Sequence, residues 1–224
     1  MSLIRTTKHY PAFGQSDRHI ILLCGFGGRV WQNLRLIRLM RQAGYHVTAL
    51  DFHKTVLSSG DPTLLPQLVR EVHAFAEAEA TRLGRPPLLV GISLGALIAL
   101  NIVRRSTTFR QAVLVTGGDI VKVAQKIYRH VWPTTYDELA HEWREVNMYS
   151  EPASLAGKRL LFVLPTKDKQ VDPADVYEEV ARQRAAGNEI ELLERTRFGH
   201  LGTIIYETIW RPRTIIEYVR RFEP

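Results

Sequence analysis

The feature that most constrains the fold of this chain is an alternation of short apolar runs with longer segments of helical periodicity. Between the runs, apolar residues recur three or four positions apart, which is typical of amphipathic helices. Strands that are apolar along their whole length are typical of a parallel sheet covered by helices on both faces. The pattern therefore predicts a doubly wound α/β fold with a mostly parallel sheet. The expected strands are residues 19–23, 45–52, 87–92, 111–116, 159–164 and 189–194, and the expected helices are 30–40, 64–83, 94–105, 174–186 and 203–221.

One interval breaks this rhythm. About forty residues separate the strands at 111–116 and 159–164, which is more than one crossover helix needs. Two apolar stripes at helical spacing fall within the interval. We interpret residues 119–157 as a small helical cap inserted in a single domain that spans residues 1–224; the alternative is that both helices pack on the core. The stripes are Ile120, Ala124, Ile127 and Val131, followed by Tyr136, Leu139, Trp143 and Val146.

Composition narrows the class of protein. A chain of 224 residues with 45% hydrophobic and 24% charged residues fits one globular domain and excludes a disordered or fibrous protein. The single cysteine, Cys24, excludes an intrachain disulfide framework and a cysteine-rich zinc site. The first ten residues lack the apolar region of a signal peptide, and the stretch Leu88–Leu100 is too short to span a bilayer. We therefore expect a cytoplasmic protein without stable membrane insertion.

The charge balance raises the question of an anionic partner. Lysine and arginine number 30 against 23 aspartate and glutamate, which gives a net charge of +7. The arginines are dispersed over expected helices, without the interleaved aromatic residues of a nucleic-acid stacking surface. We interpret them as solvated helix faces and expect no nucleic-acid partner. Anionic substrates or surfaces remain open.

The sequence Gly91-Ile92-Ser93-Leu94-Gly95 carries the strongest chemical signal. It matches G-x-S-x-G, and it lies directly after an apolar strand and directly before a helix. A strand-to-helix turn this tight needs glycine on both sides of the serine. Such a turn holds the Ser93 hydroxyl above the sheet, next to the Leu94 N–H at the positive end of a helix. The alternative is a glycine-rich turn with an idle serine.

A nucleophilic serine needs a base, and the base needs an orienting acid. His200 lies between Gly199 and Leu201, just after the last expected strand and before the C-terminal helical region. Asp168 lies just after the 159–164 strand. Ligands of open α/β sheets bind at the carboxyl ends of the strands, where Ser93, Asp168 and His200 all fall.

Nearly the whole chain resembles the α/β-hydrolase superfamily. The resemblance rests on the loop after the first strand, the Ser93 turn, the insertion, the Asp168 segment and the Gly199-His200 loop. It implies an α/β-hydrolase fold in which Ser93 is the nucleophile, His200 the general base and Asp168 its partner. It also implies an oxyanion hole formed by the backbone N–H groups of Phe26 and Leu94.

The chain departs from the family pattern in two ways. Cys24 stands where the family usually has histidine in the oxyanion loop, and this affects the support of the loop more than its main-chain donor. We interpret Cys24 as a small buried hydrophobic residue rather than a thiol nucleophile. Few residues precede His19, so the N-terminus is abbreviated, and we expect the first of the family's usual eight strands to be missing.

Two other aspartates compete with Asp168 for the role of the acid. Asp172 precedes Pro173, which is typical of a residue that caps a helix. Asp119 follows the 111–116 strand, a position that some family members use for the acid. Both remain open alternatives at the level of sequence.

These observations predict a serine hydrolase, a carboxylesterase or thioesterase, that cleaves an ester or thioester through an acyl-enzyme. We expect a small-molecule substrate with an apolar acyl group, no cofactor and no metal, and we leave a homodimer open. Aromatic and methionine side chains of the insertion either line an apolar substrate pocket or pack within the cap. These residues are Trp132, Tyr136, Trp143, Met148 and Tyr149.

Two alternatives belong to other classes of protein. The first is a non-catalytic ligand-binding protein on a hydrolase scaffold, since a fold does not determine a function. The second is a dinucleotide-binding oxidoreductase, because Gly25, Gly27 and Gly28 follow a strand and Asp51 ends the next strand. Val30 occupies the third glycine position of that motif, where it would crowd the packing of helix on strand.

Overall fold

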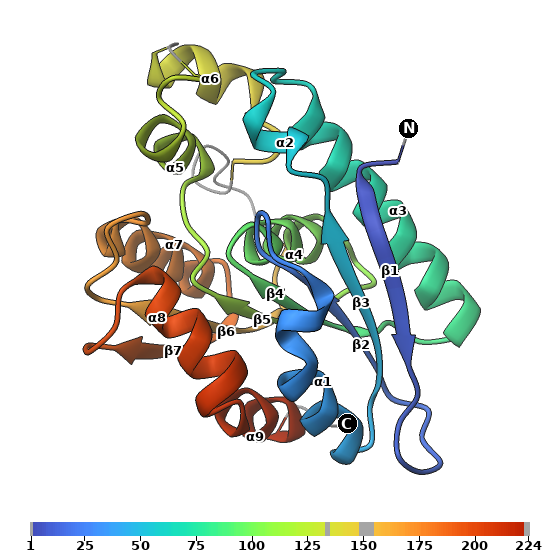
Figure 1. The fold of residues 1–224 in the computed structure, drawn as a ribbon. Helices are drawn as coiled ribbons and strands as arrows, with labels where there is room; N and C mark the ends of the chain where they lie inside the picture. The colour runs from blue at the N-terminus through green and yellow to red at the C-terminus, as the bar shows by residue number, and fades with distance from the viewer. Residues whose placement is uncertain (1, 133–134, 148–154, 222–224) are drawn as a thin grey trace.

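The computed structural model describes residues 2–132, 135–147 and 155–221, and these residues form one sheet of seven strands. The strand order is β1-β3-β2-β4-β5-β6-β7 (Figure 1). Strand β1 runs antiparallel to β3, and every other neighbouring pair is parallel. The predicted doubly wound, mostly parallel sheet is therefore confirmed. The strands are β1 (Ile4–Tyr10), β2 (His19–Leu23), β3 (His46–Phe52), β4 (Leu88–Ile92), β5 (Gln111–Val115), β6 (Arg159–Pro165) and β7 (Glu189–Arg195).

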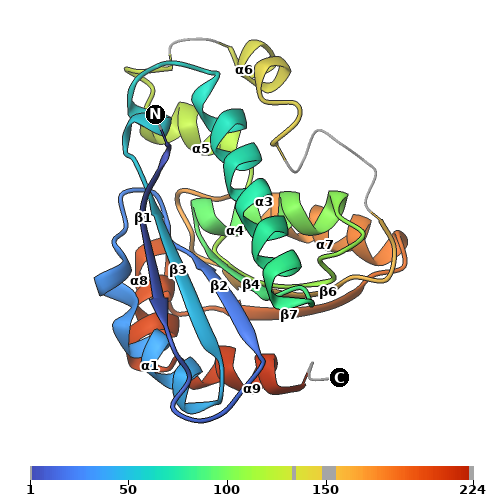
Figure 2. The same cartoon turned by 90° about the vertical axis from the view of Figure 1, so that its right-hand side faces the viewer.

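Helices cover both faces of the sheet because its central strands are apolar on both sides (Figures 1 and 2). In β2, Ile20 and Leu22 join the core beneath α1 and α9, whereas Ile21 and Leu23 join the core beneath α3 and α4. The helices are α1 (Leu34–Gln42), α2 (Thr55–Ser58), α3 (Leu64–Leu83), α4 (Leu94–Arg105), α5 (Ile120–Ile127), α6 (Tyr136–Glu142), α7 (Pro173–Ala185), α8 (His200–Ile205) and α9 (Arg213–Arg221), with a 3-10 turn η1 (Val30–Asn33) and a π-helical turn η2 (Tyr206–Trp210).

The N-terminal strand β1 is absent from the strands predicted by sequence. Its residues are polar or only partly buried, so the segment lacks the continuous apolar run that marks the other strands. It pairs along β3 at the edge of the sheet, with Tyr10 opposite Val47 and Thr7 opposite Leu50. The described residues thus form seven strands, one fewer than the family's usual eight, although the segment before His19 does contribute a strand.

Helices α5 and α6 belong to the segment that we interpret as a cap. They lie beyond the carboxyl ends of the strands, near α2 and the start of α3 (Figures 1 and 2). Trp132 and Trp143 are both buried and pack edge to face, with ring centroids 5.0 Å apart. Their indole N–H groups donate to the backbone carbonyls of Leu57 and Pro62 at 2.9 Å. These two tryptophans therefore anchor the segment to α2 and to the loop that follows it.

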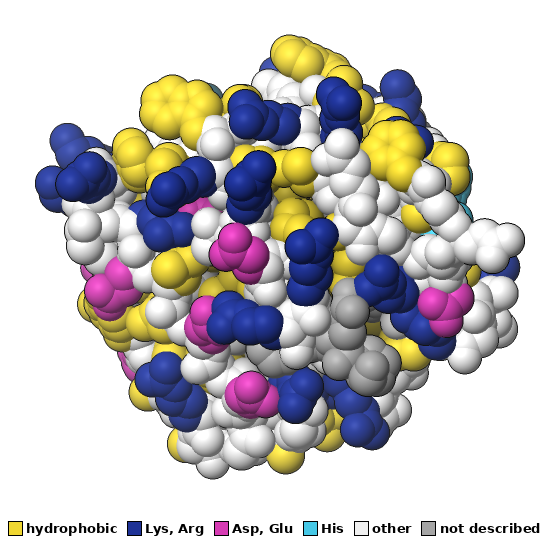
Figure 3. All heavy atoms as spheres, turned by 90° about the horizontal axis from the view of Figure 1, so that it is seen from below, with side chains coloured by type: hydrophobic (Ala, Val, Ile, Leu, Met, Phe, Trp, Pro, Cys, Tyr) yellow, Lys and Arg dark blue, Asp and Glu magenta, His cyan; other side chains and the backbone are white. Residues whose placement is uncertain are grey.

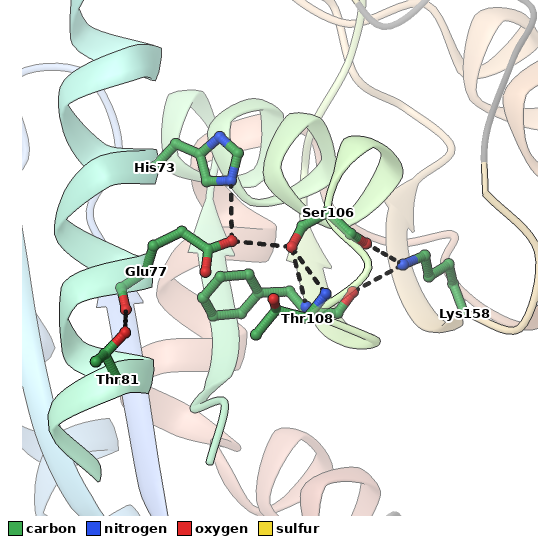
Figure 4. Close-up of polar contacts among 7 residues, drawn as sticks. His73, Glu77, Thr81, Ser106, Thr108 and Lys158 are labelled. Atoms are coloured by element: carbon green, nitrogen blue, oxygen red, sulfur yellow. Dashed lines mark hydrogen bonds and ion pairs between the residues drawn. The ribbon is translucent and has the colours of Figure 1, made fainter. Parts of the chain in front are cut away.

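A polar cluster at the opposite edge of the sheet fixes the point where the chain enters β6 (Figure 4). The buried Lys158 ammonium donates to the backbone carbonyls of Ser106 and Phe109. The Ser106 hydroxyl donates in turn to Glu77 of α3 at 3.0 Å, and the same carboxylate oxygen lies 3.3 Å from Nε2 of His73. Burial lowers the pKa of Lys158. The cluster has a structural explanation, since it ties α3, the loop before β5 and β6 together.

Candidate active site

Ser93 lies in a strained turn between β4 and α4. Its backbone has φ 54° and ψ −115°, a conformation that L-residues rarely adopt. A Cβ atom on Gly91 would lie 2.2 Å from the carbonyl oxygen of Gly95, and a Cβ atom on Gly95 would lie 2.1 Å from that of Leu23. Both positions therefore require glycine, as the G-x-S-x-G pattern predicts. The turn presents the Ser93 side chain at the carboxyl edge of the sheet.

The structure brings three of the predicted site residues into one chain of hydrogen bonds. Oγ of Ser93 lies 3.0 Å from Nε2 of His200, and Nδ1 of His200 lies 2.7 Å from Oδ2 of Asp168. The other oxygen of Asp168 accepts backbone N–H groups of Gln170 at 2.7 Å and Val171 at 3.1 Å. The Asp168 side chain is fully buried, and that of His200 is 10% exposed. These contacts fix the imidazole between an acid and a hydroxyl.

Neither rival aspartate contacts His200. Asp119 caps α5, accepts the N–H groups of Val121 and Lys122, and accepts the Tyr136 hydroxyl at 2.8 Å. Asp172 caps α7 by accepting the N–H of Ala174 at 3.0 Å, as its position before proline predicts. Both carboxylates are engaged at helix ends, so only Asp168 of the three aspartates meets the imidazole.

The two predicted oxyanion donors, Phe26 and Leu94, lie beside Ser93. Both line the same pocket as the Ser93 side chain. Leu94 is the first residue of α4, so its N–H has no acceptor within the helix. The loop of Phe26 approaches the turn closely, since a Cβ atom on Gly25 would lie 3.2 Å from Cβ of Ser93. The Phe26 ring packs edge to face on Tyr128, 5.4 Å away.

The pocket above Ser93 has a volume of about 680 Å³ and is mostly apolar. One wall comes from α5 and the residue that follows it, and the others come from residues 25–28, Leu57, η1, Gln170, α8 and η2. Of the insertion residues considered for an apolar pocket, Trp132, Tyr136 and Trp143 do not line this one. The two tryptophans contact α2 and the loop after it, Tyr136 contacts Asp119, and Met148 and Tyr149 lie outside the described residues. The apolar lining residues include Phe26, Trp31, Leu57, Ile120, Val123, Ile127, Tyr128, Leu201, Ile204, Ile205 and Ile209.

Cys24 is fully buried beneath the Phe26 loop. Burial raises the pKa of its thiol to about 12, and the amide of Asn33 donates to its sulfur at 3.4 Å. A thiol in this environment stays protonated and is inert as a nucleophile. The structure thus agrees with the interpretation of Cys24 as a small buried hydrophobic residue.

A buried ion pair supports the Phe26 loop, and the sequence analysis missed it. Arg5 of β1 contacts both carboxylate oxygens of Asp51, at 2.9 and 2.7 Å. Asp51 also accepts the N–H of Val30 at 3.1 Å, and Arg5 donates to the carbonyl of Gly28 at 3.4 Å. Asp51 is the residue that a dinucleotide site would need for a ribose, but here it holds the loop. No local sequence signal marks Arg5, because β1 itself was not predicted.

We expect Arg5→Met to destabilise the protein by about 3 kcal/mol, because it leaves the Asp51 carboxylate buried without its counter-charge. The same change should lower kcat for any substrate that uses the Phe26 N–H, since the loop loses the hydrogen bond from Arg5 to the Gly28 carbonyl and Asp51 loses the partner that positions it. Urea unfolding and steady-state kinetics measure the two effects. The matched variant Arg5→Met/Asp51→Asn removes the buried charge and should recover part of the stability; a double variant less stable than Arg5→Met would contradict the argument.

The comparison with family models assigns the chain to a class of protein. The model described as the alpha/beta hydrolase family matches residues 20–197, which include Phe26, Ser93 and Asp168 but not His200. The chain therefore belongs to the alpha/beta hydrolase family. No curated protein sequence matches it.

Solved structures share the fold at low sequence identity. An esterase of Pyrococcus furiosus is 21% identical, with a TM-score of 0.65 over 92% of this chain and 83% of that one. Esterase 2 of Thermogutta terrifontis, phosphonylated by sarin, is 14% identical, with a TM-score of 0.71 over 96% and 88%. A monoacylglycerol lipase of Paleococcus ferrophilus is 16% identical, with a TM-score of 0.66 over 95% and 97%. At these identities the likeness establishes the fold alone.

Two further findings concern the described ranges only. Within them, no helix combines the length and the apolar character needed to cross a membrane. Among the same residues, no cluster of three or more histidine, cysteine, aspartate or glutamate side chains is arranged to hold a metal ion.

Proposed function

We propose that this protein is a serine hydrolase that cleaves a carboxylic ester or thioester through an acyl-enzyme. The observation that carries the proposal is the chain of contacts from Ser93 through His200 to Asp168 at the base of an apolar pocket. A hydroxyl, an imidazole and a buried carboxylate in this order form the nucleophile, base and orienting acid of acyl transfer. The family membership and the esterase and lipase structures of the same fold support the choice of an ester bond.

In the first half of the reaction, Oγ of Ser93 attacks the acyl carbonyl carbon while Nε2 of His200 takes the hydroxyl proton. Asp168 holds the imidazole in the tautomer with hydrogen on Nδ1 and stabilises the imidazolium that forms. The N–H groups of Phe26 and Leu94 donate to the oxyanion of the tetrahedral intermediate. Collapse of this intermediate breaks the bond to the alcohol or thiol, which leaves with the proton from His200.

In the second half, His200 takes a proton from water, and the hydroxide attacks the acyl carbon bound to Ser93. Collapse of the second intermediate releases the carboxylic acid and returns the proton to Oγ of Ser93. Every residue in this scheme comes from one chain, so the scheme does not require a homodimer.

We assign the apolar pocket to the acyl group and residues 119–157 to a cap over it. Ile120, Val123, Ile127 and Tyr128 of this segment line the pocket. Removal of an acyl chain from water into such a lining is favourable by about 0.8 kcal/mol per buried methylene. Activity should therefore rise with chain length until the pocket is filled.

The test of the proposed function is labelling by a fluorophosphonate, which requires an activated serine. We expect one phosphonyl group per chain by intact mass, located on the peptide that contains Ser93, and no label on Ser93→Ala. The matched control Ser59→Ala alters an exposed serine and should label like the wild type. An unlabelled wild-type protein that still binds fatty acids would indicate a non-catalytic binding protein. Rates on p-nitrophenyl esters and acyl-CoA thioesters, from acetyl to palmitoyl, then separate esterase from thioesterase.

A further inference from the structure

Large hydrophobic side chains are exposed at the mouth of the pocket. Six of the nine exposed large hydrophobic residues in the described ranges line this pocket or the groove next to it: Ile127 of α5 and the five residues named below. Folded monomers rarely gather so much exposed apolar surface without a partner. Trp31, Leu201 and Ile209 line the pocket above Ser93, and Leu34 and Trp210 line the groove next to it. We call these five residues the apolar rim; Trp31, Leu201 and Trp210 are 66, 64 and 62% exposed.

The two halves of the rim come from different ends of the chain but form one surface. Trp31 and Leu34 lie one helical turn apart where η1 passes into α1. Leu201 belongs to α8, and Ile209 and Trp210 belong to η2, which contacts α1. η2 is a π-helical turn, a rare conformation that occurs often at functional sites. The rim therefore continues from the catalytic pocket onto the outer surface of α1.

A groove lined by four arginines borders the apolar rim. The groove has a volume of about 660 Å³ and contains Arg35 and Arg38 of α1 together with Arg211 and Arg213. We call it the arginine groove. No aspartate or glutamate appears among its described lining residues. Figure 3 shows the molecule from the side away from α5 and α6, where Lys and Arg side chains predominate and hydrophobic side chains lie between them.

Within the described residues, Arg211 of the arginine groove interacts with the carboxylate of Glu207, whereas the other three groove arginines have no ion pair. Several arginines elsewhere pair with a carboxylate, as in Arg82 with Glu79 or Arg221 with Glu191. Within the described residues Arg35, Arg38 and Arg213 have no acidic partner. Exposed guanidinium groups without a counter-charge attract phosphate, which they bind through two hydrogen bonds.

We propose that the apolar rim and the arginine groove together dock the protein on an anionic phospholipid surface, with the mouth of the catalytic pocket facing the lipid. Tryptophan and aliphatic side chains that project outward enter the headgroup region, where tryptophan is favoured. Neighbouring arginines contact the lipid phosphates. A soluble phosphorylated ligand would account for the arginines, but it would leave three side chains that are more than half exposed without a role.

Docking in this orientation determines which class of substrate reaches the pocket. An acyl chain can pass from the lipid surface between Trp31 and Leu201 into the pocket without crossing water. The substrate is then a membrane-resident or membrane-partitioned acyl ester rather than a freely soluble one. This assignment of the substrate rests on the proposed function, whereas the docking surface rests only on the residues of the rim and the groove.

The experiment measures vesicle binding by Ser93→Ala, so the outcome does not depend on turnover. We expect this protein to cosediment with phosphatidylcholine vesicles that contain phosphatidylglycerol, weakly with pure phosphatidylcholine, and less as salt rises. Adding Arg35→Gln/Arg38→Gln should weaken the partition about 25-fold, since each basic residue near an anionic surface contributes about 1 kcal/mol. The matched control Arg110→Gln/Arg220→Gln removes the same charge from exposed positions outside the groove and should weaken it much less.

Tryptophan fluorescence provides a second measurement. Trp132 and Trp143 are buried, so a blue shift on vesicle addition should come from Trp31 and Trp210 and should shrink in Trp210→Ser. Equal binding by the two arginine double variants, or no binding to anionic vesicles at low salt, would overturn the proposal. So would binding of coenzyme A or a single-stranded oligonucleotide to the groove arginines without vesicle binding. Vesicle binding without any esterase activity would instead leave the docking surface standing and reject the proposed function.

Discussion

Ser93→Ala is expected to lower kcat on the best ester substrate by about a million-fold, because in the proposed mechanism it removes the atom that forms the acyl-enzyme. The remaining rate comes from substrate binding and from the N–H groups of Phe26 and Leu94, which the substitution leaves in place. His200→Ala should cost nearly as much, since Oγ of Ser93 then has no base at 3.0 Å. Asp168→Asn should cost about ten-thousand-fold, because an amide there favours the wrong tautomer of the imidazole.

The decisive comparison is the double variant Ser93→Ala/His200→Ala. Residues that act as one unit are strongly non-additive, so the double variant should be no slower than either single variant by more than a small factor. Steady-state kinetics on a p-nitrophenyl ester measures all four rates, and Ser59→Ala serves as the control. Urea unfolding should show all of these proteins folded, since alanine adds no atoms at the turn. Full esterase activity in Ser93→Ala would reject Ser93 as the nucleophile.

The central sheet could be predicted from sequence because buried parallel strands need apolar residues on both faces. Strand β4 reads Leu-Leu-Val-Gly-Ile and is followed at once by a serine between glycines, so strand, turn and helix all have a local signal. The contact between Asp168 and His200 followed from the rule that sites gather at the carboxyl ends of strands. The proline after Asp172 predicts that this residue caps a helix, which made Asp168 the better candidate for the acid.

The parts that escaped prediction lack such local signals. Strand β1 is a polar edge strand that is held in place by pairing with β3. Its partner residues lie about 40 positions away in the sequence, so the hydrophobic pattern of β1 itself gives no sign of the pairing. The Arg5–Asp51 ion pair depends on that strand. Likewise, Trp132 and Trp143 are as hydrophobic as any pocket residue, and only the positions of α2 and the loop after it show that these tryptophans pack there and not in the pocket.

Gly95→Ala is expected to destabilise the protein by more than about 4 kcal/mol, or to prevent it from folding. The added Cβ would lie 2.1 Å from the carbonyl oxygen of Leu23, 2.6 Å from its carbonyl carbon and 2.9 Å from the carbonyl oxygen of Cys24. All three atoms are backbone, so no side-chain rotation relieves the overlap. Helix α4 would have to move away from β2, which opens the centre of the core.

The matched control is Gly14→Ala, because a Cβ atom at Gly14 would have nothing within 4 Å. We expect that variant to unfold within about 0.5 kcal/mol of the wild type, as surface substitutions usually do. Urea unfolding followed by far-UV circular dichroism, together with the soluble yield, measures both proteins. If Gly95→Ala unfolded at the same urea concentration as Gly14→Ala, the close approach of α4 to β2 would be wrong. The comparison thus separates the glycines that shape the turn from Ser93 itself, whose loss should abolish turnover while the fold stays intact.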